Sequence, residues 1–273
     1  MAGYTPPPGF YASSFTFLYS GQDGNNNLKL KANAALDVLS LLWVSDMKVL
    51  GGVFGMGLYA PMGYQKVTAG LNPSGVLPGV WNYISNDVKT IGDPLPLAFL
   101  AWQNGNFHYK LSGMVNVPIG DYSRTRIANI GLNRWAGDIT GSVTWLDPVS
   151  NFEISVSPGV TFNGVNRDTN YKTGTEFHLE AAVMYHASAS FSAGLAGYHY
   201  KQLTGDSGLG ATQGSLKGQV SAIGPNFTYN FQVGHRPVYA SARWMREFNA
   251  KNRLQGDVGY LTLTVPLGAL PSR

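Results

Sequence analysis

The chain has 273 residues, no cysteine and a formal net charge of +4; only 12% of its residues are charged, while 44% are hydrophobic. Soluble globular domains carry about 25% charged residues, so this chain has half the usual material for a solvated surface. Its aromatic content and low charge exclude intrinsic disorder, and the lack of cysteine excludes disulfides and thiolate metal sites. The longest mostly apolar run, Val38 to Val44, is far shorter than the roughly 20 residues of a membrane-spanning helix. A transmembrane β-barrel fits both limits, because its lipid-facing residues alternate with lumen-facing ones.

Lysine and arginine residues are scattered singly along the chain. Proteins that bind nucleic acids gather such residues into basic patches or runs, so we expect no nucleic acid partner. Residues 1–10 show no secretory signal, so for an exported protein we expect this sequence to be the mature or a recombinant form.

Apolar residues recur at every second position over much of the chain. Between Phe107 and Val117 one parity is largely apolar and the other carries His108, Lys110 and Asn116, which is typical of a two-faced strand. The expected strands, in chain order, span residues 10–20, 34–45, 49–60, 95–103, 107–117, 138–146, 152–162, 176–186, 190–201, 221–231, 237–247 and 256–267. These lengths suit tilted strands that cross a bilayer. The sequence thus predicts an all-β fold, a transmembrane antiparallel up-and-down barrel of about 12 strands, in a single domain over residues 1–273.

The connections between these strands alternate between long and short. Tight turns are expected around residue 46 and at 104–106, 147–150, 187–189 and 234. In outer membrane barrels short turns face the periplasm and long loops face the outside. We therefore expect a bacterial outer membrane protein with both termini in the periplasm and residues 1–9 as a periplasmic extension. Residues 61–93 and 118–137 are expected as long extracellular loops that can fold inward.

Aromatic residues recur at a spacing that matches the membrane. Phe152 and Phe162 lie ten residues apart on one face, which corresponds to about 25 Å along the membrane normal for a tilted strand. That distance separates the two aromatic girdles of an outer membrane barrel. Tyr11 and Tyr19 repeat the pattern at a shorter spacing and are expected in the same girdles.

Ionisable residues fall mostly on the parity expected to face the lumen. The predicted pore-lining residues are His108, Lys110, Glu153, Glu176, His178, Glu180, Arg243 and Glu247. Because both signs of charge occur, we favour a charge-paired network that stiffens the wall. The alternative is a charged constriction that selects ionic solutes.

The triplet Glu176-x-His178-x-Glu180 also presents oxygen and nitrogen ligands on one strand face, and a metal site is the alternative interpretation of it. Pairing of such carboxylates with Lys110 or Arg243 is the commoner arrangement. We therefore expect no metal.

The expected loop at 61–93 is apolar for an extracellular segment. A loop of this size and composition is expected to cap the mouth or fold inward rather than extend into water. Trp81, Tyr83 and Trp135 would then form an entrance surface on which an aromatic solute stacks. The alternative is that these rings only pack the loops onto the rim.

Several loop and strand-edge segments carry a family resemblance. They are GDPLP at 92–96, VPIGDY at 117–122, NIGLNRW at 129–135, TGTEFH at 173–178 and GDSG at 205–208. In this order they resemble the outer membrane channel family associated with the meta-cleavage (MetA) pathway of phenol degradation, from about residue 51 onward. The resemblance implies a twelve-stranded barrel of Gram-negative bacteria, passive uptake of small hydrophobic, aromatic molecules, and no cofactor.

These observations predict a monomeric channel, not an enzyme, for passive uptake of small hydrophobic, monoaromatic molecules. Its expected partners are the lipid bilayer, lipopolysaccharide and the solutes themselves. One alternative is a narrow pore for small ions or polar solutes. The other is an outer membrane hydrolase, although the chain lacks a Gly-x-Ser-x-Gly nucleophile elbow.

Overall fold

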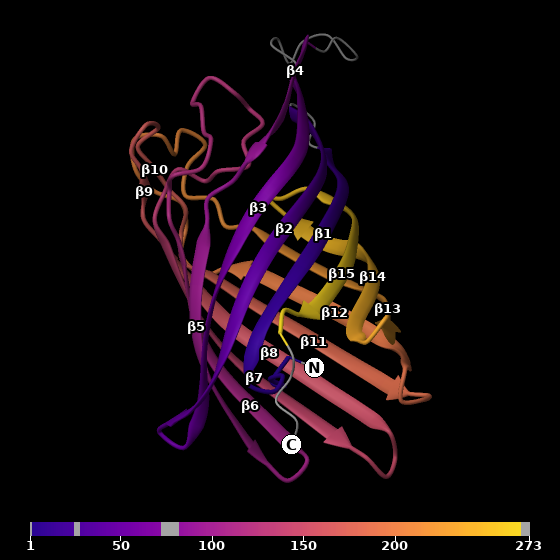
Figure 1. The fold of residues 1–273 in the computed structure, drawn as a ribbon. Coiled ribbons are helices and arrows are strands. Elements are labelled where there is room, and N and C mark those ends of the chain that lie inside the picture. The colour runs from indigo at the N-terminus through magenta and orange to yellow at the C-terminus, as the bar shows by residue number, and fades with distance from the viewer. Residues whose placement is uncertain (1, 25–27, 72–81, 269–273) are drawn as a thin grey trace.

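The chain folds into a closed antiparallel barrel of twelve wall positions (Figure 1). The computed structural model describes residues 2–24, 28–71 and 82–268, and these contain no helix long and apolar enough to cross a membrane. The strands are β1 (Gly9–Gly24), β2 (Leu28–Val49), β3 (Gly52–Leu71), β4 (Asn82–Ile91), β5 (Leu95–Asn104), β6 (Phe107–Asn116), β7 (Ala136–Asp147), β8 (Phe152–Asn163), β9 (Val165–Asn166), β10 (Tyr171–Lys172), β11 (Glu176–His186), β12 (Phe191–Gln202), β13 (Gln219–Val233), β14 (Arg236–Lys251) and β15 (Gln255–Pro266). Pairing of β1 with β15 closes the barrel, so no strand edge is left open to hydrocarbon there.

β4 and β5 share one position in the wall. The lower part of β3 pairs with β5 and its upper part, from Met62 to Leu71, pairs with β4. The predicted loop at 61–93 is therefore wrong over most of its length, because β3 and β4 continue as a hairpin beyond the barrel rim (Figure 1). Outside the membrane the outward positions of these strands are polar, as at Lys66 and Asp87, so the apolar alternation that marks a membrane strand is lost.

The first short turn also differs from expectation. The predicted turn at Asp46 is a register shift inside β2, where the Ser45 hydroxyl accepts a hydrogen bond from the Met47 amide at 2.8 Å. The chain reverses instead at Leu50 and Gly51, whose φ angles are 51° and 74°. Two consecutive residues with positive φ are typical of a tight two-residue hairpin.

The two faces of the wall are inverted relative to a soluble protein. Outward residues such as Leu41, Ile139 and Leu195 are more than half exposed, whereas many inward residues are buried polar groups. Phe152 and Phe162 are exposed on the outer face, as the girdle spacing predicts. The buried polar groups of the wall therefore face the lumen, and its outer surface is apolar.

Tyr11 and Tyr19 do not belong to the outer girdles. Tyr11 is only 6% exposed and Tyr19 lines a lumen cavity. The prediction fails because the inward parity of β1 is itself aromatic, with Phe15 and Phe17 beside the two tyrosines. Periodicity alone cannot then distinguish the lumen face from the lipid face.

The segment before β1 lies inside the barrel. The Gly3 amide donates to Thr144 Oγ1 at 2.9 Å, and the Tyr4 ring centroid lies 5.5 Å from that of His108. Thr144 and His108 belong to β7 and β6, near the end of the barrel that carries the short turns. The expected periplasmic extension is thus corrected for residues 2–8: this segment docks on the lumen wall, where polar groups offer its backbone hydrogen bonds.

Candidate functional site

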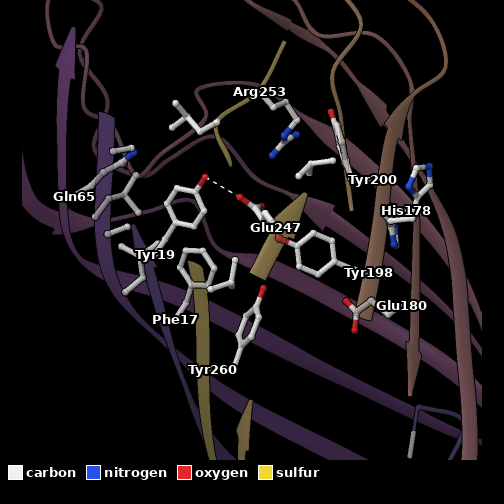
Figure 2. A pocket seen from close by; sticks show the side chains of 18 of the residues that line it. Phe17, Tyr19, Gln65, His178, Glu180, Tyr198, Tyr200, Glu247, Arg253 and Tyr260 are labelled. Carbon is white, nitrogen blue, oxygen red and sulfur yellow. Dashed lines mark hydrogen bonds between the residues drawn. The ribbon is translucent and has the colours of Figure 1, made fainter. Parts of the chain in front are cut away.

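A cavity of 520 Å³ lies in the lumen, near the end that carries the long loops (Figure 2). Its lining comes from strands on several sides of the barrel and from two loops. The residues that define its character are Phe17, Tyr19, Leu36, Ile130, Tyr198, Tyr200, Val220, Glu247, Arg253 and Tyr260. We refer to it as the upper cavity.

Glu247 of β14 fixes two of the aromatic rings. Its side chain is buried, and its Oε1 accepts a hydrogen bond from the Tyr198 hydroxyl at 2.5 Å. Its Oε2 accepts a hydrogen bond from the Tyr19 hydroxyl at 3.1 Å (Figure 2). The Gly256 amide donates to the same oxygen at 2.8 Å. Because β1 and β12 are separate parts of the wall, one satisfied carboxylate positions rings from two sides of the cavity.

Tyr200 is held in a comparable way by Glu176. The Tyr200 hydroxyl donates to Glu176 Oε1, and Asn163 Nδ2 donates to Glu176 Oε2 at 2.8 Å. The guanidinium of Arg253 lies over the Tyr200 ring, 3.9 Å from its centroid, within the range of a cation–π interaction. The hydroxyls of these tyrosines are therefore used within the wall, and their rings remain for contact with a solute.

The remaining surface of the upper cavity is largely apolar. Phe17 stacks on Tyr19 with centroids 6.1 Å apart and contacts Tyr260 at 5.4 Å, while Leu36 and Val220 add aliphatic surface. Among the residues that the structure describes, the Tyr260 hydroxyl has no hydrogen-bond partner. The cavity thus offers ring faces, aliphatic contacts and one available hydroxyl.

The loop at 117–135, between β6 and β7, forms part of the upper cavity. Asn129 and Ile130 line the cavity from this loop, and the neighbouring Ala128 is fully buried. The sequence predicted that the loop at 118–137 can fold inward, and residues 129–130 of it do reach the cavity.

Asp93, between β4 and β5, holds this loop. Its side chain is 3% exposed and accepts hydrogen bonds from the Gly120 amide at 2.9 Å, the Leu132 amide at 2.7 Å and Asn116 Nδ2 at 2.9 Å. One buried carboxylate therefore joins the break in the wall to both halves of the loop.

An ion pair clips the loop internally. Arg126 Nη1 lies 2.9 Å from Asp121 Oδ2. The Arg126 guanidinium, with a hydrogen bond from Thr90, holds the pKa of the Asp121 carboxyl below its usual range. Both side chains are partly exposed, so the pair shapes the loop with little net stabilisation.

A second, outer pocket of 420 Å³ lies on the other side of this loop. Tyr122, Leu132, Arg134 and Tyr171 contribute to its lining, and Asn129 lines both this pocket and the upper cavity. Residues 127–132 therefore form a partition between an outer pocket and the upper cavity.

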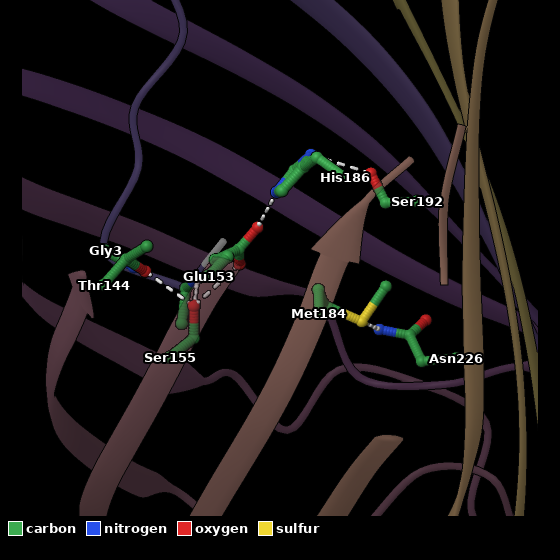
Figure 3. A network of polar contacts seen from close by, with 9 residues as sticks. Gly3, Thr144, Glu153, Ser155, Met184, His186, Ser192 and Asn226 are labelled. Carbon is green, nitrogen blue, oxygen red and sulfur yellow. Dashed lines mark hydrogen bonds and ion pairs between the residues drawn. The ribbon is translucent and has the colours of Figure 1, made fainter. Parts of the chain in front are cut away.

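The lower lumen is polar. Glu153 is 2% exposed; its Oε1 accepts from the Ser155 hydroxyl at 2.9 Å, and its Oε2 lies 3.0 Å from His186 Nε2 (Figure 3). His186 Nδ1 lies 2.8 Å from Ser192 Oγ, and Gly3 docks beside this network. An apolar solute would find its contacts in the upper cavity rather than here.

The family model described as "Putative MetA-pathway of phenol degradation" matches residues 18–263. The chain belongs to this family. This match confirms the family resemblance that the sequence segments indicate. No curated protein matches the chain in sequence.

Solved structures agree with the barrel of this phenol-degradation family member. The COG4313 outer membrane channel from Pseudomonas putida F1 superposes with a TM-score of 0.77 at 13% identity, covering 96% of each chain. The β domain of the Bordetella autotransporter BrkA gives 0.55 at 13% identity, covering 96% of this chain and 100% of that chain. The translocator domain of NalP from Neisseria meningitidis gives 0.51 at 9% identity, covering 96% and 90%. These likenesses establish the fold, and the protein is an outer membrane β-barrel.

The eight predicted pore-lining residues are distributed over the height of the lumen in this family member. His178, Glu180 and Glu247 line the upper cavity, and Glu176 stands behind Tyr200. The others lie elsewhere on the wall: His108 against Tyr4, Lys110 with its Nζ 5.5 Å from the Phe99 ring centroid, Glu153 with His186, and Arg243 with its Nη1 3.9 Å from Glu180 Oε2.

Several of these ionisable groups are paired. His178 Nε2 lies 2.8 Å from Asp138 Oδ2, and Glu180 faces Arg243. Over the described ranges, no group of three or more histidine, aspartate and glutamate side chains could hold a metal ion. The triplet Glu176, His178 and Glu180 instead turns its members to different partners.

Two of the three predicted entrance residues lie outside both cavities. Tyr83 of β4 is 60% exposed on the hairpin, and Trp135 is 58% exposed just before β7; neither lines the upper cavity or the outer pocket. Trp81 lies outside the described residues.

Sequence reasoning missed the aromatic lining. Phe17, Tyr19, Tyr198, Tyr200 and Tyr260 all lie on inward parities. The spacing Tyr198-x-Tyr200 places both rings on one strand face, and this pattern could have indicated an aromatic lumen face. In the structure, Ala196 on the same face is buried. The contribution of Arg253 comes from a loop, where parity gives no orientation.

Proposed function

We propose that this protein is a passive outer membrane channel for small hydrophobic, monoaromatic molecules, which bind in the upper cavity on their way through the wall. It acts as a monomer, because one chain completes the ladder from β1 to β15. Family membership and the likeness to an outer membrane channel support a channel rather than a hydrolase.

The observation that carries this proposal is the aromatic upper cavity. Its volume of 520 Å³ lies within the usual range of small-molecule sites. An apolar cavity of about 150 Å³ already holds benzene, so a single substituted ring fits with room to move. Ring faces of Tyr19, Tyr198 and Tyr200 give stacking contacts that require no particular substituent.

The route into the cavity is proposed to start at the outer pocket. Leu132 and Tyr122 give this pocket apolar contacts, and the partition at residues 127–132 separates it from the upper cavity. A solute would pass when this segment moves away from the wall. The hydrogen bond from the Leu132 amide to Asp93 would hold the segment in place between such movements.

A narrow pore for ions or polar solutes is the competing function. The polar lower lumen around Glu153 is the observation that favours it. Conductance distinguishes the two, because a solute channel occupied by residues 2–8 and closed by the loop at 117–135 passes little current.

The experiment uses two neighbouring alanines on β2. Ala34 lines the upper cavity, whereas Ala35 is exposed on the outer face. Ala34→Trp fills the cavity, and Ala35→Trp places the same ring at the lipid interface, where tryptophan is well accommodated. We expect Ala34→Trp to abolish most of the protein-dependent uptake of labelled toluene by intact cells, measured above that of cells without the protein, and Ala35→Trp to retain it. Equal uptake by both variants would contradict a role for the cavity.

A further inference from the structure

Three lysines lie together on the outer face of β2, β3 and β4. Lys66 of β3 is directly opposite Asn33 of β2 and Asp87 of β4. Lys31 is two residues from Asn33, and Lys89 is two residues from Asp87, so both are diagonal neighbours of Lys66 at about 7–8 Å between backbones. The strands are inclined to the barrel axis (Figure 1). The line through the three lysines is therefore more nearly parallel to the barrel rim than the strands are.

All three side chains point away from the lumen. Ala32, next to Lys31, and Gln65, next to Lys66, line the upper cavity, and successive residues of a strand face opposite sides. Lys89 is opposite Tyr64, which lies on the same outward parity as Lys66. The three lysines are exposed.

These cations have no partner within the described part of the chain. Lys31, Lys66 and Lys89 make no hydrogen bond and no ion pair there, and the Asp87 carboxylate across from Lys66 is not within 4 Å of it. By contrast, Arg246 on the outer face of β14 is neutralised by Asp257 at 2.6 Å. Three cations and one carboxylate leave this patch with a net positive charge.

The depth of the patch is set by aromatic residues below it. Phe54, which contacts Trp43 with centroids 6.3 Å apart, and Tyr64 are ten residues apart on β3. At the usual rise and tilt this spacing is about 25 Å, the height of the apolar band. Lys66 is the next outward residue above Tyr64, so the lysines lie at the level of the outer headgroups.

We propose that this wall is a binding site for lipid A, the phosphorylated glucosamine lipid of the outer leaflet. Its phosphates would pair with the ammonium groups of Lys31, Lys66 and Lys89. Its acyl chains would lie on the apolar surface below, where Leu41 and Leu58 are exposed. Cationic side chains at headgroup depth attract anionic lipid headgroups in this way. The proposal rests on the outer membrane location and is independent of what the upper cavity carries.

The test compares two triple variants of the full-length protein. Lys31→Gln/Lys66→Gln/Lys89→Gln removes the patch, and Lys48→Gln/Lys172→Gln/Arg236→Gln removes the same charge from exposed positions elsewhere. Heat-modifiable migration on gels confirms that each is folded. Native mass spectrometry then measures binding of bisphosphorylated lipid A, dephosphorylated lipid A and phosphatidylglycerol.

We expect the patch variant to bind bisphosphorylated lipid A on the order of a hundredfold more weakly than the unmodified protein does. Each lysine is expected to contribute roughly fivefold to the affinity. The control variant should bind as the unmodified protein does, and Lys→Arg at the three positions should retain binding. Dephosphorylated lipid A should bind weakly to every form. Equal loss in both triple variants, or phosphatidylglycerol binding as tightly as bisphosphorylated lipid A, would overturn the proposal.

Discussion

Buried carboxylates organise the lumen at the scale of single residues. Glu247 accepts three hydrogen bonds and Asp93 accepts three, each from partners on different segments. A buried carboxylate is tolerated only when it is paired in this way. Each of the two therefore has a specific structural consequence when it is altered.

Replacing Glu247 by glutamine should weaken solute binding in the upper cavity. The amide keeps one acceptor oxygen, so at least one of Tyr19, Tyr198 and the Gly256 amide loses the acceptor of the hydrogen bond that it donates, and the rings relax. We expect binding of a monoaromatic ligand to weaken by roughly threefold to tenfold, or about 0.7–1.4 kcal/mol. Quenching of tyrosine fluorescence by the ligand measures this, and Glu153→Gln in the lower lumen should leave the affinity unchanged.

Asp93→Asn should free the loop at 117–135. Loss of an acceptor oxygen leaves a buried donor without a partner, at about 1–3 kcal/mol, which corresponds to an increase of roughly 5- to 150-fold in the open population. Hydrogen exchange at the Leu132 amide should accelerate by this factor. Asp121→Asn, which alters a partly exposed carboxylate in the same loop, should change the exchange rate much less; equal acceleration in both would contradict the role of Asp93.

Residues 2–8, which precede β1, are an element that occupies the lower lumen without being part of the wall. Gly3 fits because it has no side chain: a Cβ there would lie 2.3 Å from the His108 carbonyl oxygen and 2.9 Å from the Thr144 amide. Since both are backbone atoms of the wall, they cannot move aside. The segment itself must leave its place if a larger residue is introduced.

Gly3→Val should therefore raise single-channel conductance in planar bilayers, because residues 2–8 no longer dock in the lower lumen. Gly113→Val adds the same atoms at a site where the nearest neighbour would be 3.8 Å away. This control should show the conductance of the unmodified protein. An unchanged conductance in a folded Gly3→Val protein would show that the segment does not limit the current.

The strands inside the membrane could be predicted from the sequence, because lipid on one side and a polar lumen on the other impose a strict alternation. β8, with Phe152 and Phe162 outward and Glu153 inward, is the clearest case. Above the membrane this constraint ends, which is why β4 was predicted as part of a loop. On β1 the lumen face is aromatic, so Tyr19 was assigned to the wrong side.

The candidate site was predictable only in part. Parity placed Glu247 and His178 inward, but the partners that give them a role come from strands far apart in the sequence, as with Tyr19 and Glu247. The docking of Gly3 and the fold of the loop at 117–135 depend on tertiary contacts that no local pattern encodes.

The molecule as a whole divides its lumen into compartments. An outer pocket and an aromatic upper cavity are separated by residues 127–132, and a polar lower lumen holds residues 2–8. The outer wall carries the opposite pattern, apolar in the membrane and basic above it at Lys66. We expect these compartments to let small apolar rings pass while polar solutes of the same size are held back.

Uptake by intact cells measures whether the protein selects small apolar rings over polar solutes. Cells with and without the protein would be given labelled toluene and, separately, a labelled sugar of similar size. We expect the protein to accelerate uptake of toluene and to leave sugar uptake at the background rate. Faster sugar uptake without faster toluene uptake would contradict this expectation and would favour a pore for polar solutes.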